Sequence, residues 1–221
     1  MIGLKTKILA TLFYLMSNQF DGTTREADIC DNAERINVIA ESVVQGTQNN
    51  MCSDNPTKAE QKVCWQHEPA KLAYFITMQG WYESKFEERI HAGKCLRHEC
   101  DAVFWNTPSG KKIFMYHQAR TPWQLHKTFY ISSEEWKSMI GTDLASTTLA
   151  ATVSGRILGF TRNRCKSDLG AIGLYATGKT CKWAGAQGRL NGIFRYYKKG
   201  QDDQWVMHQM EEYSKCYLKD K

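Results

Sequence analysis

The sequence predicts a mainly α-helical domain, and three observations lead to this class. Apolar residues recur every three to four positions in several segments, which is the spacing of one face of an α-helix. Only one stretch, Lys111 to Tyr116, is expected to form a short strand. The chain has 221 residues, of which 42% are hydrophobic and 24% charged, and it contains no internal repeat, so it can form one globular domain with its own core.

Residues 1–20 form a candidate export signal or anchor. Lys5 and Lys7 precede the apolar run ILATLFYLM, and polar residues follow it, which is the order found in secretory signals. The run is too short for an ordinary membrane span. If the segment is retained, the alternative is an amphipathic helix or a weak anchor that associates the protein with a membrane or a phage virion.

Two helices are expected in the first half of the chain, over residues 33–45 and 69–82. Pro69 suits the first turn of the second helix, because its missing N–H would have no partner there. The polar residues 47–66 lie between the helices and are expected to form a stapled loop or a short helix. The apolar faces are Ile36, Ile39, Ala40 and Val43 in the first helix, and Leu72, Phe75, Met78 and Tyr82 in the second.

The second half of the chain continues the helical pattern after an irregular segment, residues 87–104. Ser132 and Glu135 form a capping box, which marks the start of a short helix. Further segments follow: the longest helix over 144–160, the glycine-rich stretch 165–181 with the apolar middle AIGLY, a helix over 187–199, and a charged helix or tail after Gln201.

Eight cysteines, an even number, favour a disulfide framework. No CxxC pair occurs, which argues against common zinc ribbons and thioredoxin-type sites. Such a density is typical of secreted or envelope proteins, the alternative being reduced thiols in the cytosol. Sequence alone allows about 105 pairings. The pairing that we expect is Cys95–Cys100, Cys165–Cys181, Cys52–Cys64 and Cys30–Cys216.

The net charge of +6 favours an anionic partner such as nucleic acid, an acidic membrane face or the acidic polymers of a bacterial envelope. The Lys and Arg residues are scattered without a nucleic-acid motif, so nucleic acid is not expected. No metal is expected, because the spacing of His91, Cys95, His98 and Cys100 fits no familiar zinc pattern. The sequence GKT at 178–180 only superficially imitates a phosphate loop, and no cofactor is expected.

Glu83 is the candidate catalytic residue. It lies at the end of the helix over 69–82, near the negative end of the helix dipole, with Trp81 and Phe86 as apolar neighbours in sequence. Both the dipole and an apolar environment disfavour the ionised carboxylate. A carboxylic acid kept protonated near neutral pH is what a general acid requires. The alternative is an ordinary solvated glutamate at a helix end.

Three stretches with chemically useful side chains occur in a fixed order. Glu83-Ser84 closes a helix, ARTPWQLH carries Trp123 and Gln124, and GAIGLYATG carries Tyr175. In this order they resemble the E-S pair, the G-L-M-Q-like stretch and the A-Y-N-A-G stretch of the lysozyme-like lytic transglycosylases, of the soluble-lytic-transglycosylase type. The resemblance covers most of the chain and implies a peptidoglycan-cleaving enzyme.

The resemblance also implies a fold and a domain organisation. The fold would be mainly α and lysozyme-like, with disulfide-stapled loops. The transglycosylase domain would span residues 69–199. A helical extension over 21–68 would precede it, and a helix or tail over 200–221 would follow.

Carried over residue by residue, the resemblance makes Glu83 the catalytic acid and base. Ser84 would support the reacting sugar and Gln124 would line the groove. The hydroxyl of Tyr175 would hydrogen-bond the glutamate. Ala176 replaces the asparagine that usually follows this tyrosine, which removes any basis for a role of that side chain.

Aromatic residues are further candidates for substrate binding. Tyr82, Trp105, Trp123 and Trp183 could stack on sugar faces, and the alternative for each is core packing. Trp123 stands where the family often has methionine, and Pro122 stands where it usually has leucine.

In a lytic transglycosylase one carboxylate protonates the leaving oxygen and then takes the proton of the muramic acid C6 hydroxyl, which closes a 1,6-anhydro ring. A hydrolase normally needs a second carboxylate. Candidates near in sequence are Glu87, Glu88, Glu99 and Asp101. The resemblance therefore favours a lytic transglycosylase acting on the MurNAc–GlcNAc bond, exported to the periplasm or envelope or carried on a phage virion. The alternatives are a goose- or phage-type lysozyme and a non-catalytic lysozyme-like protein of a virion or secretion apparatus.

Overall fold

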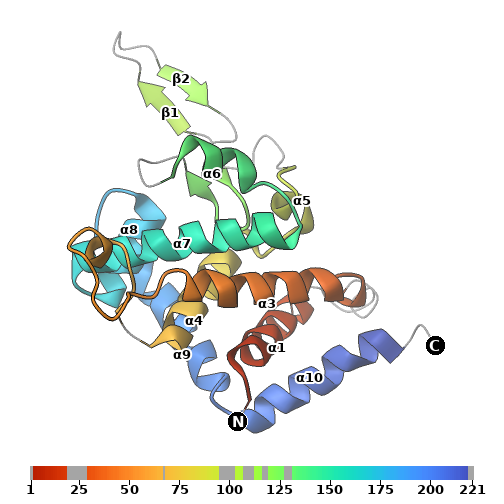
Figure 1. The fold of residues 1–221 in the computed structure, drawn as a ribbon. Coiled ribbons are helices and arrows are strands. Elements are labelled where there is room, and N and C mark those ends of the chain that lie inside the picture. Colours follow the sequence, from red (N-terminus) through yellow and green to blue (C-terminus); the bar gives the residue numbers. More distant parts are fainter. Residues whose placement is uncertain are drawn as a thin grey trace.

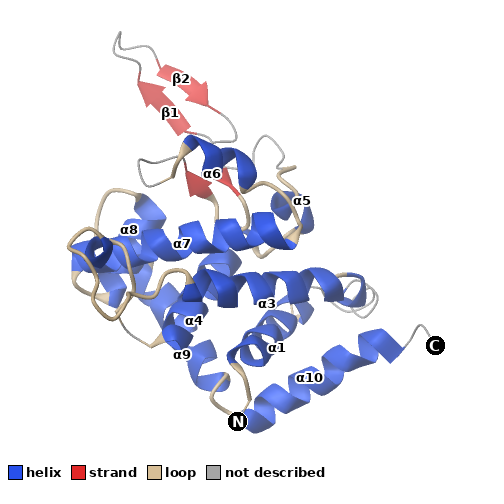
Figure 2. Cartoon of the chain, in the orientation of Figure 1, coloured by secondary structure: helices blue, strands red, loops and turns tan. Residues whose placement is uncertain are grey.

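Helices form most of the structure, as the sequence predicted (Figures 1 and 2). The computed structural model describes residues 2–18, 29–66, 68–94, 103–106, 112–115, 119–126 and 131–218. The longer helices there are α1 (Leu4–Ser17), α3 (Ala33–Gln48), α4 (Pro69–Ser84), α7 (Leu144–Cys165), α8 (Asp168–Thr177), α9 (Ala186–Lys199) and α10 (Asp203–Leu218). The shorter elements are η1 (Glu60–Lys62), α5 (Glu88–His91), α6 (Ser133–Ser138), and the strands β1 (Val103–Asn106), β2 (Lys112–Met115), β3 (Ala119–Arg120) and β4 (Leu125–His126).

The central element is α4, the helix that carries Glu83. Helices α1, α3, α7 and α9 all pack against it. Every residue from Leu72 to Ile76 is 0% exposed, so successive side chains meet protein on all sides of the helix. A helix that is apolar all round belongs in the middle of a core. The four surrounding helices therefore bury α4 on all sides, whereas an amphipathic helix is buried on one face.

Helix α1 belongs to the same core. Its residues Ile8, Ala10 and Leu12 are 0% exposed, and the helix packs against α3, α4 and α10. One hydrophobic cluster extends from Ile8 to Tyr213, across the expected limits of the N-terminal and C-terminal segments. The stretch expected to act as a signal or anchor is thus a core helix in this structure. Within the described ranges, no helix is long and apolar enough to cross a membrane.

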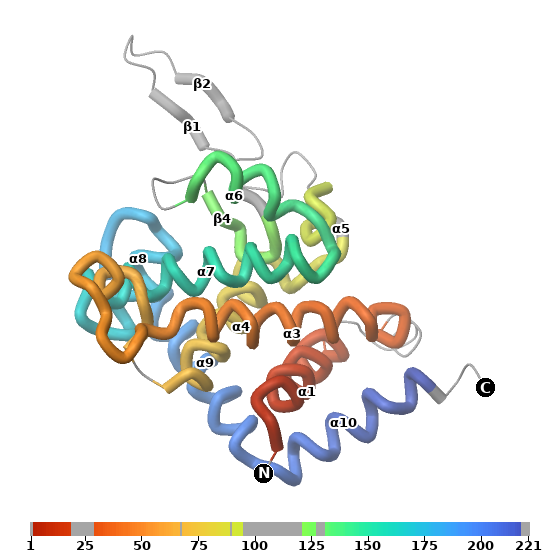
Figure 3. Tube along the Cα trace, in the orientation of Figure 1, coloured from red at the N-terminus to blue at the C-terminus, as the bar shows by residue number. Residues whose placement is uncertain are grey.

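Helices α3 and α7 lie side by side across α4 (Figures 1 and 3). Gly46 permits their close approach, because a Cβ atom at this position would lie 2.9 Å from the backbone carbonyl carbon of Ala151. Helix α6 is tied to α7 by a salt bridge between Glu135 and Arg156, at 2.8 Å. The predicted capping box is present: the Glu135 N–H donates to the Ser132 hydroxyl at 3.0 Å, and the Ser132 N–H donates to the Glu135 carboxylate at 2.9 Å.

Two segments are more regular than the sequence analysis expected. Residues 87–104 contain α5 and the start of strand β1, which pairs antiparallel with β2, the strand predicted over 111–116. The glycine-rich stretch 165–181 contains α8, for which no helix was predicted. Ser167 caps its start by accepting the Gly170 N–H at 3.0 Å, and Gly178 ends it with a φ of 65°. These local signals, together with burial of the apolar middle, outweigh the low helix propensity of glycine.

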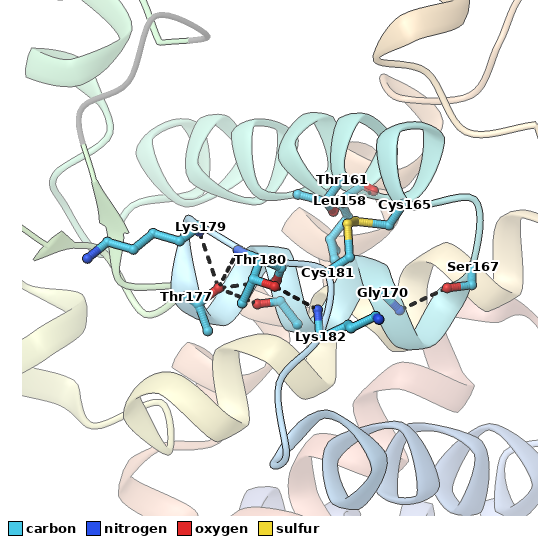
Figure 4. Close-up of a disulfide and its surroundings, with 11 residues drawn as sticks. Leu158, Thr161, Cys165, Ser167, Gly170, Thr177, Lys179, Thr180, Cys181 and Lys182 are labelled. Atoms are coloured by element: carbon cyan, nitrogen blue, oxygen red, sulfur yellow. Dashed lines mark hydrogen bonds between the residues drawn. A yellow bond between two sulfur atoms is a disulfide. The ribbon is translucent and has the colours of Figure 1, made fainter.

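Three disulfides join the pairs that the sequence analysis favoured: Cys30–Cys216, Cys52–Cys64 and Cys165–Cys181. The fourth predicted pair, Cys95–Cys100, lies outside the described residues. Figure 4 shows how Cys165–Cys181 closes the ends of the α8 segment onto each other, with Thr177 receiving the N–H groups of Lys179 and Thr180. The GKT sequence thus follows the C-terminus of a helix. A phosphate loop requires it at an N-terminus.

His91, the last residue of α5, is 1% exposed. Its Nε2 lies 2.8 Å from the hydroxyl of Thr147, and no described residue is a partner for its Nδ1. Burial lowers the pKa of His91 to about 4, the positive charge of Arg35 lowers it as well, and Asp143 acts in the opposite sense. The folded protein therefore holds a neutral imidazole at pH values where the unfolded chain, with a pKa of about 6.5, takes up a proton.

This difference predicts acid sensitivity. The contribution of His91 to stability is complete above about pH 6.5 and is lost as the pH falls toward 4, because only the unfolded state binds the proton in that window. Over the whole window the free energy of unfolding should fall by about 3 kcal/mol on account of this residue. Urea unfolding from pH 4 to 7 of the wild type and His91→Gln measures the effect. The two curves should converge at low pH, and parallel curves would refute the assignment.

Candidate active site

The last turn of α4 places Glu83 where the chain reverses direction. Lys85 and Phe86 follow it, both with a φ of 54°. This left-handed conformation is uncommon for residues other than glycine and costs of order 1–3 kcal/mol each. The Ser84 hydroxyl stabilises the reversal, since it donates to the Gly80 carbonyl at 3.2 Å and accepts the Phe86 N–H at 3.1 Å.

A second turn with the same unusual backbone packs against the first. Thr121 and Gln124 have φ values of 69° and 48°. Between them, Trp123 donates its indole N–H to the Ile76 carbonyl of α4 at 2.8 Å and packs edge-on against Phe86, with ring centroids 5.9 Å apart. Among the described residues, four of the five non-glycine residues with positive φ lie in these two turns. Backbone strain of this kind is concentrated at functional sites in proteins.

Tyr175, from the third predicted stretch, lies against the turn of Trp123. Its hydroxyl donates to the Trp123 carbonyl at 3.2 Å and lies 3.1 Å from the Ser154 hydroxyl of α7. Burial raises the pKa of Tyr175, and the negative charge of Glu83 raises it further. The Ser154 hydrogen bond and the charge of Arg189 act in the opposite sense. The hydroxyl of Tyr175 thus binds Trp123 and Ser154, and the hydrogen bond to Glu83 that the resemblance implied is not present among the described residues.

The other predicted binding residues take different positions. Trp123 is 0% exposed, so the prediction that its ring stacks on a sugar is wrong: this aromatic belongs to the core. Ser84 is 5% exposed, and its two hydrogen bonds hold its own turn. Tyr82 is half-buried and donates its hydroxyl to the Arg189 carbonyl at 3.3 Å. Gln124 is half-buried in its turn, with its N–H donated to the Thr121 carbonyl at 3.0 Å.

Arg189, on α9, is the residue that sequence reasoning missed. Its Nη1 forms an ion pair with Oε1 of Glu83, and the two side chains are 19% and 20% exposed. The same Nη1 donates to Oε1 of Gln79, one turn earlier on α4, at 3.4 Å. The expectation of a carboxyl with only apolar neighbours is therefore incomplete, because a guanidinium faces it.

Two rings hold this guanidinium. Its carbon lies 5.3 Å from the ring centroid of Tyr82 and 5.0 Å from that of Trp183. Gly192 lets α9 approach closely, since a Cβ atom there would lie 1.8 Å from the Tyr82 hydroxyl. Trp183, a candidate for sugar stacking, thus contacts Arg189, and the side chain of Trp105 lies outside the described residues.

A sequence signal for Arg189 exists. It falls in the first turn of α9, where the helix dipole disfavours a cation, so an arginine there indicates an anionic partner elsewhere in the fold. Gln79 precedes Glu83 by four positions and therefore shares its helix face. Neither residue stands out without the knowledge that α9 packs on α4.

Of the four candidates for a second carboxylate, two lie in the described part of the chain and two lie outside it. Glu88 is exposed at the start of α5, and its charge acts on Arg35 of α3. Glu87 precedes it and is half-buried. Glu99 and Asp101 lie outside the described residues. In the described part of the chain, no group of three or more His, Cys, Asp or Glu side chains is arranged to hold a metal ion.

Comparisons with protein-family models, with curated proteins and with solved structures found no match for this chain.

The position of the Tyr175 hydroxyl predicts a stability difference. Tyr175→Phe removes the donor to the Trp123 carbonyl and should lower the free energy of unfolding by about 1–2 kcal/mol, because buried acceptors lose their partner. Tyr197→Phe is the matched control, since the hydroxyl of Tyr197 donates to Glu68 in an exposed hydrogen bond, and it should change stability by less than about 0.5 kcal/mol. Urea unfolding of both variants measures the difference, and equal effects would contradict the placement of Tyr175.

Proposed function

We propose that this protein is a lytic transglycosylase with a lysozyme-like fold, which cleaves the glycosidic bond between N-acetylmuramic acid and N-acetylglucosamine in peptidoglycan. One observation carries the proposal: Glu83 ends a buried central helix, the turn that follows it packs through Phe86 against Trp123, and the Tyr175 hydroxyl binds the Trp123 carbonyl. These are the three stretches on which the family resemblance rests. Three disulfides are compatible with an exported protein.

Glu83 would act twice. As an acid it protonates the leaving glycosidic oxygen while the C1–O bond breaks and the sugar becomes oxocarbenium-like. The substrate's own N-acetyl group supports C1 at this stage. As a carboxylate it then takes the proton of the C6 hydroxyl, and O6 bonds to C1 to close the 1,6-anhydro ring. The proton returns to Glu83, and no water is consumed.

The contacts of Glu83 would hold its carboxyl in one orientation. Oε1 is held by Arg189, while Oε2 has no partner in the described ranges and can face the substrate. The packing of Tyr175 against the Trp123 turn would keep the site in one geometry.

The test is Glu83→Gln, which preserves the shape of the side chain and removes the proton donor. The rate of turbidity loss of purified cell walls should fall by roughly 10²–10⁴-fold, the usual contribution of a general acid. Glu212→Gln is the control, because this carboxylate on α10 is 41% exposed and pairs only with Lys215 in the described structure. The melting temperature of each variant shows that it is folded.

Mass spectrometry of the released fragments defines the reaction. Anhydro ends, each one water lighter than a reducing end, support the transglycosylase. Reducing ends would contradict the transglycosylase reaction and identify a hydrolytic lysozyme. Wall binding without released fragments would indicate a binding protein, and full activity of Glu83→Gln would rule out the role of this residue.

A further inference from the structure

Arg189 and Glu83 meet at a single point. Nη1 of the guanidinium contacts Oε1 of the carboxylate, and the second hydrogen bond of the arginine side chain, to Gln79, uses Nη1 again. No described residue is a partner for Nε or Nη2 of Arg189. Arginine and carboxylate often pair through two parallel hydrogen bonds. Here a pair of donors on the guanidinium remains unused beside the candidate catalytic group.

The unused edge of Arg189 is held in a fixed orientation. The rings of Tyr82 and Trp183 lie close to the guanidinium, and the Tyr82 hydroxyl binds the backbone of Arg189 itself. The side chain is 19% exposed, so it is neither freely mobile in solvent nor sealed in the core. A pre-oriented guanidinium fork matches the planar, bidentate geometry of a carboxylate.

Gln79 supports this arrangement at a cost to stability. It is 0% exposed, its Oε1 accepts from Arg189, and no described residue is a partner for its Nε2. A buried donor without a partner costs about 1–3 kcal/mol. An apolar side chain would avoid this cost, and the glutamine is therefore better explained by its hold on Arg189 than by packing.

The local charge favours an added anion. Lys85 places its ammonium 4.7 Å from the ring centroid of Trp81 and 5.8 Å from that of Tyr82. Burial lowers the pKa of Lys85, and repulsion from the charge of Arg189 lowers it further. The cations of Lys85 and Arg189 thus both lie beside the Tyr82 ring, and a second carboxylate there would relieve their repulsion.

We propose that Arg189 forms an anion subsite beside Glu83, which binds a carboxylate of the glycan strand through Nε and Nη2. This inference rests on the proposed function, since it names the feature of the substrate that the site selects. The strand carries such groups on the lactyl ether of muramic acid or on the attached peptide. Strands with a free carboxylate are bound in preference to neutral amino-sugar chains.

Binding is measured by titration calorimetry in the Glu83→Gln background, where substrate is not consumed. The ligands are a MurNAc–GlcNAc tetrasaccharide with free lactyl carboxylates, its methyl ester, the same tetrasaccharide bearing peptides, and a neutral GlcNAc tetrasaccharide. The acid should bind about 10- to 100-fold more tightly than the ester, as a charged hydrogen-bonded pair implies. If only the peptide-bearing strand shows the preference, the peptide supplies the carboxylate.

Arg189→Gln should abolish this preference, because it weakens binding of the free acid far more than binding of the neutral ligands. Arg189→Lys should restore part of it, because the charge returns without the fork. Arg164→Gln, which removes an exposed cation at the end of α7, is the control and should keep the full preference. Equal weakening of acidic and neutral ligands by Arg189→Gln would assign the residue a structural role and overturn the proposal, as would a parent protein without any preference.

The failure of this subsite is distinguishable from the failure of the proposed function. Cleavage of cell walls without carboxylate preference would refute only the anion subsite. Carboxylate preference without any cleavage by the wild type would refute the enzymatic function and indicate an anion-selective glycan-binding protein.

Discussion

The burial of α4 on all sides decides where the chemistry can occur. The helices around it cover its apolar residues from Leu72 to Ile76, so the helix has no freedom to rotate or slide. Its last turn leaves this surrounding layer, and Glu83 stands there with a fixed direction. The turns and the arginine around Glu83 all make contacts with α4 or with residues that α4 positions.

Energetically unfavourable features of the described structure gather at the C-terminal end of α4, where Glu83 lies. The two turns beside it hold non-glycine residues in the left-handed conformation, and the buried amide donor of Gln79 has no partner among the described residues. The tightly packed core of α1, α3, α4 and α7 offsets the free-energy cost of these features. Proteins tend to break the local rules of stable structure where they function. The position of the strained turns therefore agrees with the position of the candidate carboxylate.

Much of the helical framework followed from the sequence, because apolar spacing and caps are local signals. The helix over 69–82, the capping box at Ser132 and three of the cysteine pairs are present. The missed helix α8 depended on caps at both ends of a glycine-rich run. Trp123 was misplaced because its burial depends on Phe86, which approaches from a different turn. Arg189 was missed because no local rule states that α9 crosses α4 at that turn.

The bond between Cys30 and Cys216 connects residues separated by 186 positions and ties the chain's first described segments to its last helix. Nearly the whole protein is thereby a covalent ring. A protease that severs one peptide bond inside the ring releases nothing, since both fragments stay attached through sulfur. In surroundings rich in degradative enzymes, such a chain can sustain a nick in an outer loop and retain every residue around Glu83.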